Sequence, residues 1–96
     1  MHARVTTLDG SPADVDNGIA NFRENVLPFV DEGGKGAILL VDRQSGKAVA
    51  ITLWEDADAL AASEEAANAL RADAAREMGA QQPSVDRYEV AVFEVR

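Results

Sequence analysis

Hydrophobic residues follow the periodicity of β-strands in four segments of the chain. The first segment is rich in β-branched residues, and the next two are continuous apolar runs joined by RQSG, in which Gly46 can take the positive φ of a hairpin turn. The last segment is again rich in β-branched and aromatic residues. The four predicted strands are residues 3–8, 37–42, 47–54 and 85–95.

Two segments between these strands have helical periodicity instead. Ser11 and Pro12 begin the first helix, because serine favours the N-cap and proline favours the first helical position. Pro28 should kink its last turns, since proline has no backbone donor. The second helix extends from the N-cap candidate Asp56 to Gly79. The apolar face of the first helix carries Val15, Ile19, Phe22, Val26, Phe29 and Val30, and the inward face of the second carries Leu60, Ser63, Ala67, Leu70, Ala74 and Met78.

The order of these elements, βαββαβ, predicts the fold class. It is α+β, a ferredoxin-like plait in which two helices cover one face of a four-stranded antiparallel sheet. No linker, low-complexity tract or repeat divides the sequence. A chain of 96 residues is too short for a second hydrophobic core, so we expect a single domain over residues 1–96.

Both faces of the predicted sheet carry apolar residues. In the third strand Val49, Ile51 and Leu53 point to one face, and Ala48, Ala50, Thr52 and Trp54 point to the other. Two helices can cover only one face, so we expect a second copy of the chain to pack on the other, as a sheet-to-sheet homodimer. The alternative is a sheet that shows scattered apolar residues to water.

The composition restricts the kinds of molecule that the protein is expected to bind. A net charge of −8 and an isoelectric point near 4.4 disfavour binding to nucleic acid, because the phosphate backbone would be repelled. The absence of cysteine excludes disulfides, thiolate nucleophiles and thiolate metal sites. No apolar run approaches the roughly 20 residues that cross a bilayer, and the first residues lack the pattern of a signal peptide. We therefore expect a cytoplasmic protein that binds neither membranes nor nucleic acid.

The segment NFRENVLPFVDEGGKGAILLVDRQSGKAVAITLWEDADAL, residues 21–60, combines four features in order. These are a helix, a glycine-flanked turn, a strand hairpin, and a tryptophan followed by an acid-rich helix start. In this pattern the chain resembles the dimeric α/β-barrel superfamily, in particular its antibiotic biosynthesis monooxygenase-like domains. The resemblance covers nearly the whole chain as architecture, but it consists of residue types and contains no catalytic signature.

The resemblance implies several activities. Some members oxygenate phenolic substrates without metal or flavin, some degrade haem, others isomerise lactones, and many have no known activity. The haem-degrading branch uses a histidine on the second helix and an asparagine on the first strand. This chain has neither residue in those segments, so haem degradation is disfavoured and we expect no cofactor.

Trp54 is the only tryptophan and lies where the third strand meets the second helix. Its indole could wall a pocket and donate its N–H to a substrate oxygen. The alternative, which we favour, is that Trp54 seals a surface, either in the dimer contact or at the end of the core, because aromatic residues are enriched at interfaces.

Three further polar residues are candidates for a site. Asn25 lies at the edge of the first helix stripe and Ser63 lies within the second, where an amide or hydroxyl could hold a phenolate or ketone oxygen. Ser63 could equally be a small packing residue that bonds to its own helix. Tyr88 and its neighbour Arg87 could bind an anionic ligand, or they could simply belong to an exposed edge strand.

Two functions remain open. The first is a cofactor-independent monooxygenase that acts on a small phenolic or aromatic compound, with Trp54, Asn25, Ser63 and Tyr88 at its site. The second is a non-catalytic dimeric module that binds a small ligand or serves in assembly. A cavity between helices and sheet with at least two convergent polar groups would favour the enzyme.

Overall fold

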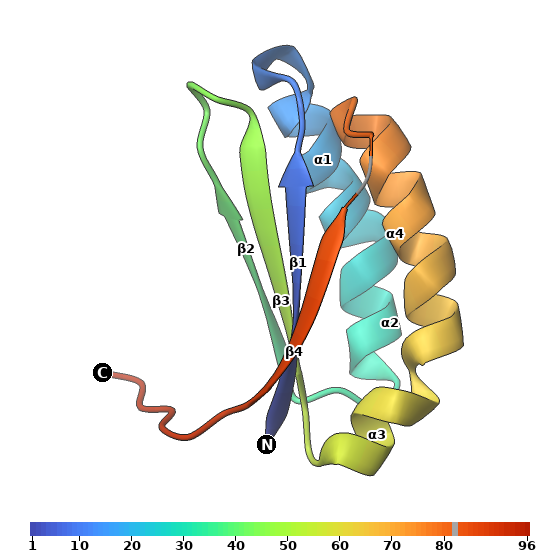
Figure 1. Cartoon of the computed structure of the whole chain (residues 1–96), viewed down its shortest axis with the longest axis vertical. Coiled ribbons are helices and arrows are strands. Elements are labelled where there is room, and N and C mark those ends of the chain that lie inside the picture. The colour runs from blue at the N-terminus through green and yellow to red at the C-terminus, as the bar shows by residue number, and fades with distance from the viewer. Residues whose placement is uncertain (82) are drawn as a thin grey trace.

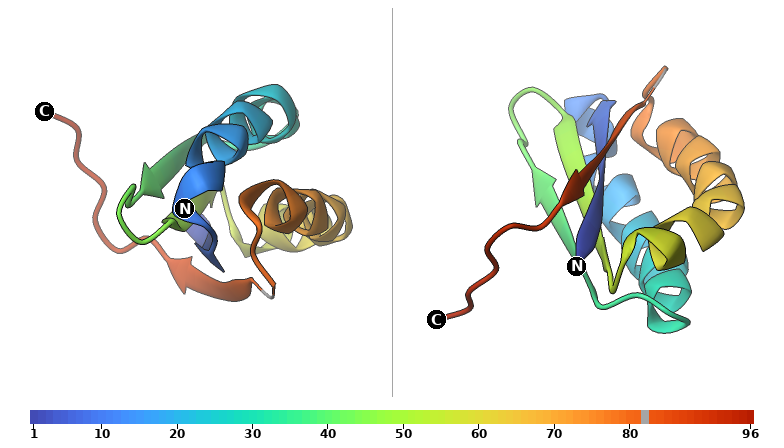
Figure 2. Two further views of the ribbon diagram at one scale, coloured as in Figure 1. Left: turned by 90° about the horizontal axis from the view of Figure 1, so that it is seen from above. Right: turned by 60° about the horizontal axis from the view of Figure 1, so that its bottom comes forward.

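The predicted strands form one antiparallel sheet in the order β2-β3-β1-β4, which is the arrangement of a ferredoxin-like plait (Figure 1). The structure, a computed structural model, describes residues 1–81 and 83–96. The helices lie together on one face of the sheet and leave the other face open (Figure 2). The strands are β1 (His2–Asp9), β2 (Gly36–Val41), β3 (Lys47–Trp54) and β4 (Ser84–Glu89).

The first helical segment is continuous but changes its winding. It consists of a short 3-10 turn η1 (Pro12–Asp14), α1 (Val15–Asn21), a π-helical turn η2 (Phe22–Val26) and α2 (Leu27–Asp31). The N–H of Leu27 donates to the carbonyl of Phe22, one residue further back than in an α-helix. This wide turn ends at Val26, two residues before Pro28, which has no N–H for an α-helical hydrogen bond. The irregularity expected from Pro28 is therefore present as a π turn.

The predicted helix ends are mostly confirmed. Asp56 accepts a hydrogen bond from the N–H of Ala59 at 2.8 Å, and Gly79 ends the last helix with a left-handed φ of 67°. Ser11 precedes the first turn in an extended conformation, but its side chain caps no N–H of the described backbone. The first helical segment therefore starts where predicted without the expected hydroxyl cap.

The prediction of one unbroken second helix is wrong at Ser63. The segment forms two helices, α3 (Ala57–Ala62) and α4 (Glu64–Met78). The Ser63 hydroxyl donates to the carbonyl of Leu60 at 2.7 Å, and a side chain from β1 donates to the same carbonyl. The Leu60 carbonyl also accepts the backbone N–H of Ser63 at 3.2 Å, three residues ahead and not four, so the last turn of α3 tightens at this point.

Period-two alternation divides the sheet into the two predicted faces. Leu8 and Ala48 point toward the helices and form a buried cluster with Ala75 and Met78 of α4. Leu40, on the opposite face of β2, is 52% exposed. The open face therefore exposes apolar side chains at Ile38 and Leu40, whereas Ala3 and Leu53 on the same face are buried.

The last strand is shorter than predicted, since β4 ends at Glu89 and not at residue 95. Glu89 pairs with His2, where β1 begins, so the residues beyond it have no neighbouring strand in the described structure. The N–H of Val90 still donates to the carbonyl of Met1 at 2.9 Å, and the chain then leaves the body of the molecule (Figures 1 and 2). This terminal segment carries the exposed residues Val92, Phe93 and Val95.

Gly18 sets how closely α1 approaches α4. A Cβ atom at this position would lie 1.8 Å from Sδ of Met78, a distance that no packed structure allows. Met78 is only 2% exposed, so its side chain cannot move aside without disturbing the core. The contact between these helices therefore requires glycine.

We expect Gly18→Ala to destabilise the protein by about 1–3 kcal/mol through overpacking. Helix propensity alone predicts the opposite sign, since alanine is favoured over glycine in a helix by about 1 kcal/mol. Urea unfolding measured beside Gly33→Ala provides the control, because nothing described lies within 4 Å of a Cβ at Gly33. A Gly18→Ala variant as stable as wild type would contradict the close packing.

Candidate functional site

The candidate site is built around Arg4, a charged residue in β1 that is only 3% exposed. Strand alternation directs its side chain to the helix-covered face, together with Thr6 and Leu8. A guanidinium removed from water is costly unless its donors find acceptors. The surroundings of Arg4 must therefore supply polar partners within an otherwise apolar layer.

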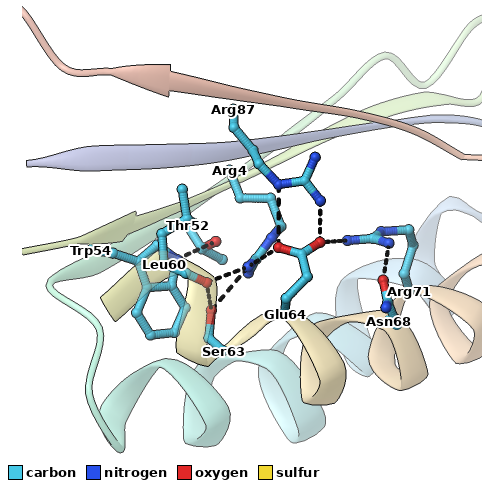
Figure 3. A network of polar contacts seen from close by, with 9 residues as sticks. All are labelled: Arg4, Thr52, Trp54, Leu60, Ser63, Glu64, Asn68, Arg71 and Arg87. Atoms are coloured by element: carbon cyan, nitrogen blue, oxygen red, sulfur yellow. Dashed lines mark hydrogen bonds and ion pairs between the residues drawn. The ribbon is translucent and has the colours of Figure 1, made fainter. Parts of the chain in front are cut away.

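The break between α3 and α4 supplies those partners. Nη2 of Arg4 lies 3.0 Å from the carbonyl oxygen of Leu60, 2.9 Å from Oγ of Ser63 and 2.8 Å from Oε2 of Glu64 (Figure 3). All three acceptors come from the turn at which the helix is interrupted. The interruption and the buried arginine are therefore one structural feature.

Trp54 lies beside Arg4, at the end of β3. The Arg4 guanidinium carbon is 5.7 Å from the centre of the indole, and the ring of Phe29 packs against the indole at a centroid distance of 5.5 Å. The indole N–H donates to the hydroxyl of Thr52 at 3.0 Å. Of the positions considered for Trp54, the structure shows the one inside the core, since its side chain is buried and faces the helices and not the open sheet face.

Glu64 is the single carboxylate shared by three arginines. It accepts hydrogen bonds from Arg87 on β4 and from Arg4, and Nη2 of Arg71 lies 3.7 Å from its Oε1 (Figure 3). The hydrogen bond from Arg87, helped by Arg4, lowers the pKa of Glu64 from 4.5 to about 2, against the opposing effect of burial. Burial lowers the pKa of Arg71, and Glu64 counteracts this effect.

A cavity of about 60 Å³ lies next to this network, between β1 and β3 on one side and α2 and α4 on the other. Its polar lining residues are Arg4, Thr6, Thr52 and Arg71, and the rest of its wall is apolar, with Leu8, Phe29 and Ala67 among the residues that form it. The volume is several times the roughly 10–15 Å³ that one ordered water needs, but it is well below a drug-sized pocket. The cavity is suited to a small molecule.

Both arginines of the cavity have hydrogen-bond donors left over. Nε and Nη1 of Arg4, and Nε and Nη2 of Arg71, are buried and make no hydrogen bond to any described residue. Nη1 of Arg71 is held by Oδ1 of Asn68 at 2.6 Å, which fixes the orientation of the side chain. Two buried arginines beside the cavity thus keep donor atoms without a hydrogen bond to a described residue, although Nη2 of Arg71 lies 3.7 Å from Oε1 of Glu64.

The structure brings together only part of the candidate set that the sequence suggested. Trp54 and Ser63 both contact Arg4. Asn25 is exposed, its amide donates to Oδ1 of Asn21 at 2.7 Å, and it is not among the residues that line the cavity. Tyr88 is exposed on the open face of the sheet, opposite Ala3.

Sequence reasoning considered Arg87 as an anion-binding residue but missed the other charged residues of the site, Arg4, Glu64 and Arg71. Strand alternation could have indicated Arg4, because it places this arginine on the same face of the sheet as Thr6 and Leu8. Glu64 and Arg71 gave no such signal, because charges on an alanine-rich helix normally face solvent. Within residues 1–81 and 83–96, no group of three or more histidine or acidic residues could hold a metal ion. No helix in the same ranges is long and apolar enough to cross a membrane.

We expect the stability of the protein to decrease as the pH falls from about 4.5 to about 2, because Glu64 becomes protonated in the unfolded chain before it does in the folded one. Its contribution is complete above the unfolded pKa and disappears below the folded one. Glu64→Gln should cost about 1.5–3 kcal/mol at neutral pH and flatten this part of the profile. Urea unfolding across the pH range measures both effects.

Glu65→Gln is the matched control, since Glu65 is exposed and lies in the same first turn of α4. Both variants lose the same favourable interaction with the helix N-terminus. If the two profiles coincide, the ion pairs of Glu64 do not stabilise the fold.

Comparison with known sequences gives relatives without an assigned activity. No family model matches the chain. Over 95 residues it is 40% identical to the uncharacterized proteins Rv2557 and Rv2558 of Mycobacterium tuberculosis (strain H37Rv). The matched region covers 97% of this chain but 42% and 40% of those two proteins, so the chain spans about two fifths of their length.

Comparison with solved structures identifies the fold. A Deinococcus radiodurans protein assigned to the antibiotic biosynthesis monooxygenases superposes with a TM-score of 0.74 at 14% identity, covering 100% of this chain and 99% of that one. SnoaB, a cofactor-independent oxygenase of Streptomyces nogalater solved as a mutant, gives 0.66 at 20% identity, with 96% and 94% covered. A dimeric ferredoxin-like protein from an uncultured marine organism gives 0.71 at 8% identity, with 99% and 91% covered. The chain therefore has the ferredoxin-like fold of the antibiotic biosynthesis monooxygenase-like proteins, as its resemblance to them predicts.

Proposed function

We propose that the protein binds a small phenolic or aromatic compound in the cavity between sheet and helices and oxygenates it without a cofactor. The observation that carries this proposal is the cavity itself, which combines apolar walls with the convergent polar groups of Arg4, Thr6, Thr52 and Arg71. A space filled by side chains would have favoured a purely structural module. The similarity in fold to a cofactor-independent oxygenase supports the choice of reaction.

The arrangement favours the ionised form of a bound phenol. Guanidinium groups next to a phenol lower its pKa, because they stabilise the phenolate relative to the neutral form. The described polar lining includes no carboxylate or imidazole, so the protein promotes ionisation by stabilising the anion and not through a general base. The hydroxyl of Thr52, which already accepts the indole N–H of Trp54, can donate its own proton to the same oxygen.

A phenolate that is rich in electrons can reduce oxygen directly. With hydroquinone the balanced reaction is hydroquinone plus dioxygen giving hydroxybenzoquinone plus water. The carbon that is hydroxylated and the two hydroxyl groups supply the four electrons that dioxygen takes up. One oxygen atom enters the product and the other leaves as water, so no external reductant is needed.

The test is oxygen uptake with hydroquinone and catechol, together with mass analysis of the product formed under isotopically labelled dioxygen. Incorporation of one labelled atom is expected. Ala67→Leu should fill the cavity and lower the rate at least about tenfold, since overpacking a site costs about 1–3 kcal/mol. Ala66→Leu, at an exposed position on the same helix, is the control and should keep the wild-type rate.

Oxygen uptake without label in the product would mean simple oxidation and would contradict the monooxygenase proposal. The same holds if Ala66→Leu and Ala67→Leu react at equal rates, because the reaction would then not use the cavity. Binding without any turnover would favour the alternative, a non-catalytic ligand-binding module.

The open face of the sheet supports the proposed homodimer. Ile38, Leu40 and Tyr88 are exposed on it, and Val92 and Phe93 of the terminal segment extend the same apolar character away from the body. Monomeric soluble proteins seldom leave such a surface to water. A second copy offers a complementary apolar face and, with it, a place for the terminal segment, and one protein of the same fold is described as dimeric.

Leu40→Asp should convert the dimer into a folded monomer, because it places two charges in the contact of a symmetric pair. Leu27→Asp is the control, since this exposed leucine lies on α2, on the opposite side of the sheet. Light scattering measures the mass and circular dichroism the fold. A monomeric wild type, or equal masses for both variants, would contradict the sheet-to-sheet arrangement.

A further inference from the structure

We infer that the ligand of the cavity carries a carboxylate, held by Arg71 and Arg4, and that the compound is a small aromatic acid. The inference rests on the proposed function in that it concerns the same cavity, but it assigns the chemical class of the ligand and not the reaction. It follows from the charge balance of the site, the orientation of the free donors and the shape of the space beside them.

The charge balance leaves the site positive within an acidic protein. Arg4, Arg71 and Arg87 all contact Glu64, so three guanidinium groups share one carboxylate. Arg87 on β4 already holds both oxygens of Glu64. The excess charge therefore lies with Arg4 and Arg71, the two arginines that line the cavity. An anion placed there would be favoured by both.

The donor atoms of Arg71 that make no hydrogen bond, Nε and Nη2, are the pair through which a guanidinium binds a carboxylate side-on. Arg87 binds the two oxygens of Glu64 through Nε and Nη2, the side-on fork of the guanidinium. In Arg71 the same two atoms, Nε and Nη2, are buried and make no hydrogen bond to the described residues. Of this pair, Nε has no acceptor and Nη2 has only the ion pair with Oε1 of Glu64 at 3.7 Å, so Arg71 holds no carboxylate through both atoms as Arg87 does.

Arg4 adds a second, more deeply buried group. Its Nη2 is engaged with the turn between α3 and α4, which holds the guanidinium in place. Its Nε and Nη1 remain without an acceptor among the described residues, although the side chain is only 3% exposed. Buried donors without an acceptor destabilise the fold, so a ligand that supplies acceptors at this point is favoured.

The apolar wall of the cavity indicates what the ligand carries besides its carboxylate. Next to the arginines the wall is formed by Leu8, Phe29 and Ala67, which favour an apolar ring over a sugar or a peptide. The volume of about 60 Å³ limits the compound to a small one. A planar benzoate would place its carboxylate on Arg71 and its ring against Phe29. Because a cavity that binds benzene measures about 150 Å³, the space of about 60 Å³ has to widen to admit the ring.

Binding of 4-hydroxybenzoate to the wild-type protein, measured by calorimetry, tests the inference without requiring turnover. We expect it to bind at least about tenfold more tightly than 4-hydroxybenzamide, which has the same shape without the charge. The methyl NMR signals of Ala67 and Ala74, both in the cavity wall, should shift on binding. Equal affinity for acid and amide would overturn the inference, as would inorganic phosphate binding as tightly as the aromatic acid.

Arg71→Gln should weaken the binding of 4-hydroxybenzoate at least about tenfold and leave that of the amide nearly unchanged. Arg76→Gln is the matched control, because Arg76 is exposed on the same helix and pairs with Asp73. Neither variant removes Arg4, so the buried network that holds the fold is retained, and urea unfolding checks this directly. An equal effect of the two substitutions would assign the preference to general charge and contradict the role of Arg71.

The outcomes separate this inference from the proposed function. If the acid binds selectively but no phenol is oxygenated, the carboxylate site stands and the oxygenase does not. If hydroquinone is oxygenated in the cavity but acid and amide bind alike, the oxygenase stands and the carboxylate site is wrong.

Discussion

The burial of the Arg4 guanidinium is the constraint on which the site depends. A cation in the layer between sheet and helices is tolerated only where acceptors surround it, and strand β1 can offer none, because its own polar backbone groups are used in the sheet. The chain meets this need by interrupting a helix at Ser63, which leaves the carbonyl of Leu60 and the carboxylate of Glu64 within reach. One arginine thus explains a break that helix propensity alone would not produce.

The network around Glu64 also decides what the cavity can hold. Its carboxylate contacts three guanidinium groups. Arg87, which does not line the cavity, donates two hydrogen bonds to it. What remains inside is a surplus of donors against apolar walls. Such an arrangement disfavours a metal ion, because the guanidinium groups would repel a cation. It also disfavours a neutral ligand, because the buried donors would stay unpaired. The proposed anionic ligand would use both the surplus donors and the apolar walls.

The sequence allowed the strands, the order of the elements along the chain and the two faces of the sheet to be derived, because these depend on local periodicity. The helix cap at Asp56 and the hairpin turn at Gly46 could also be derived, because each depends only on residues close in the sequence. The break at Ser63 could not be found in this way, since it depends on a hydrogen bond from a residue far away in the chain. The early end of β4 likewise depends on where its pairing partner β1 begins. The site escaped prediction for the same reason: Arg4 and Glu64 meet only after the chain has folded.

Strand alternation places the two proposed activities on opposite sides of the same strands. In β1, Arg4 and Thr6 face the cavity, while Ala3 and Val5 face the open side of the sheet. Side chains on the two faces do not touch, so association of two copies can influence the cavity only by shifting the backbone of β1 or β3. Because both strands are paired on each side within the sheet, such shifts are small. Association and ligand binding should therefore be largely independent.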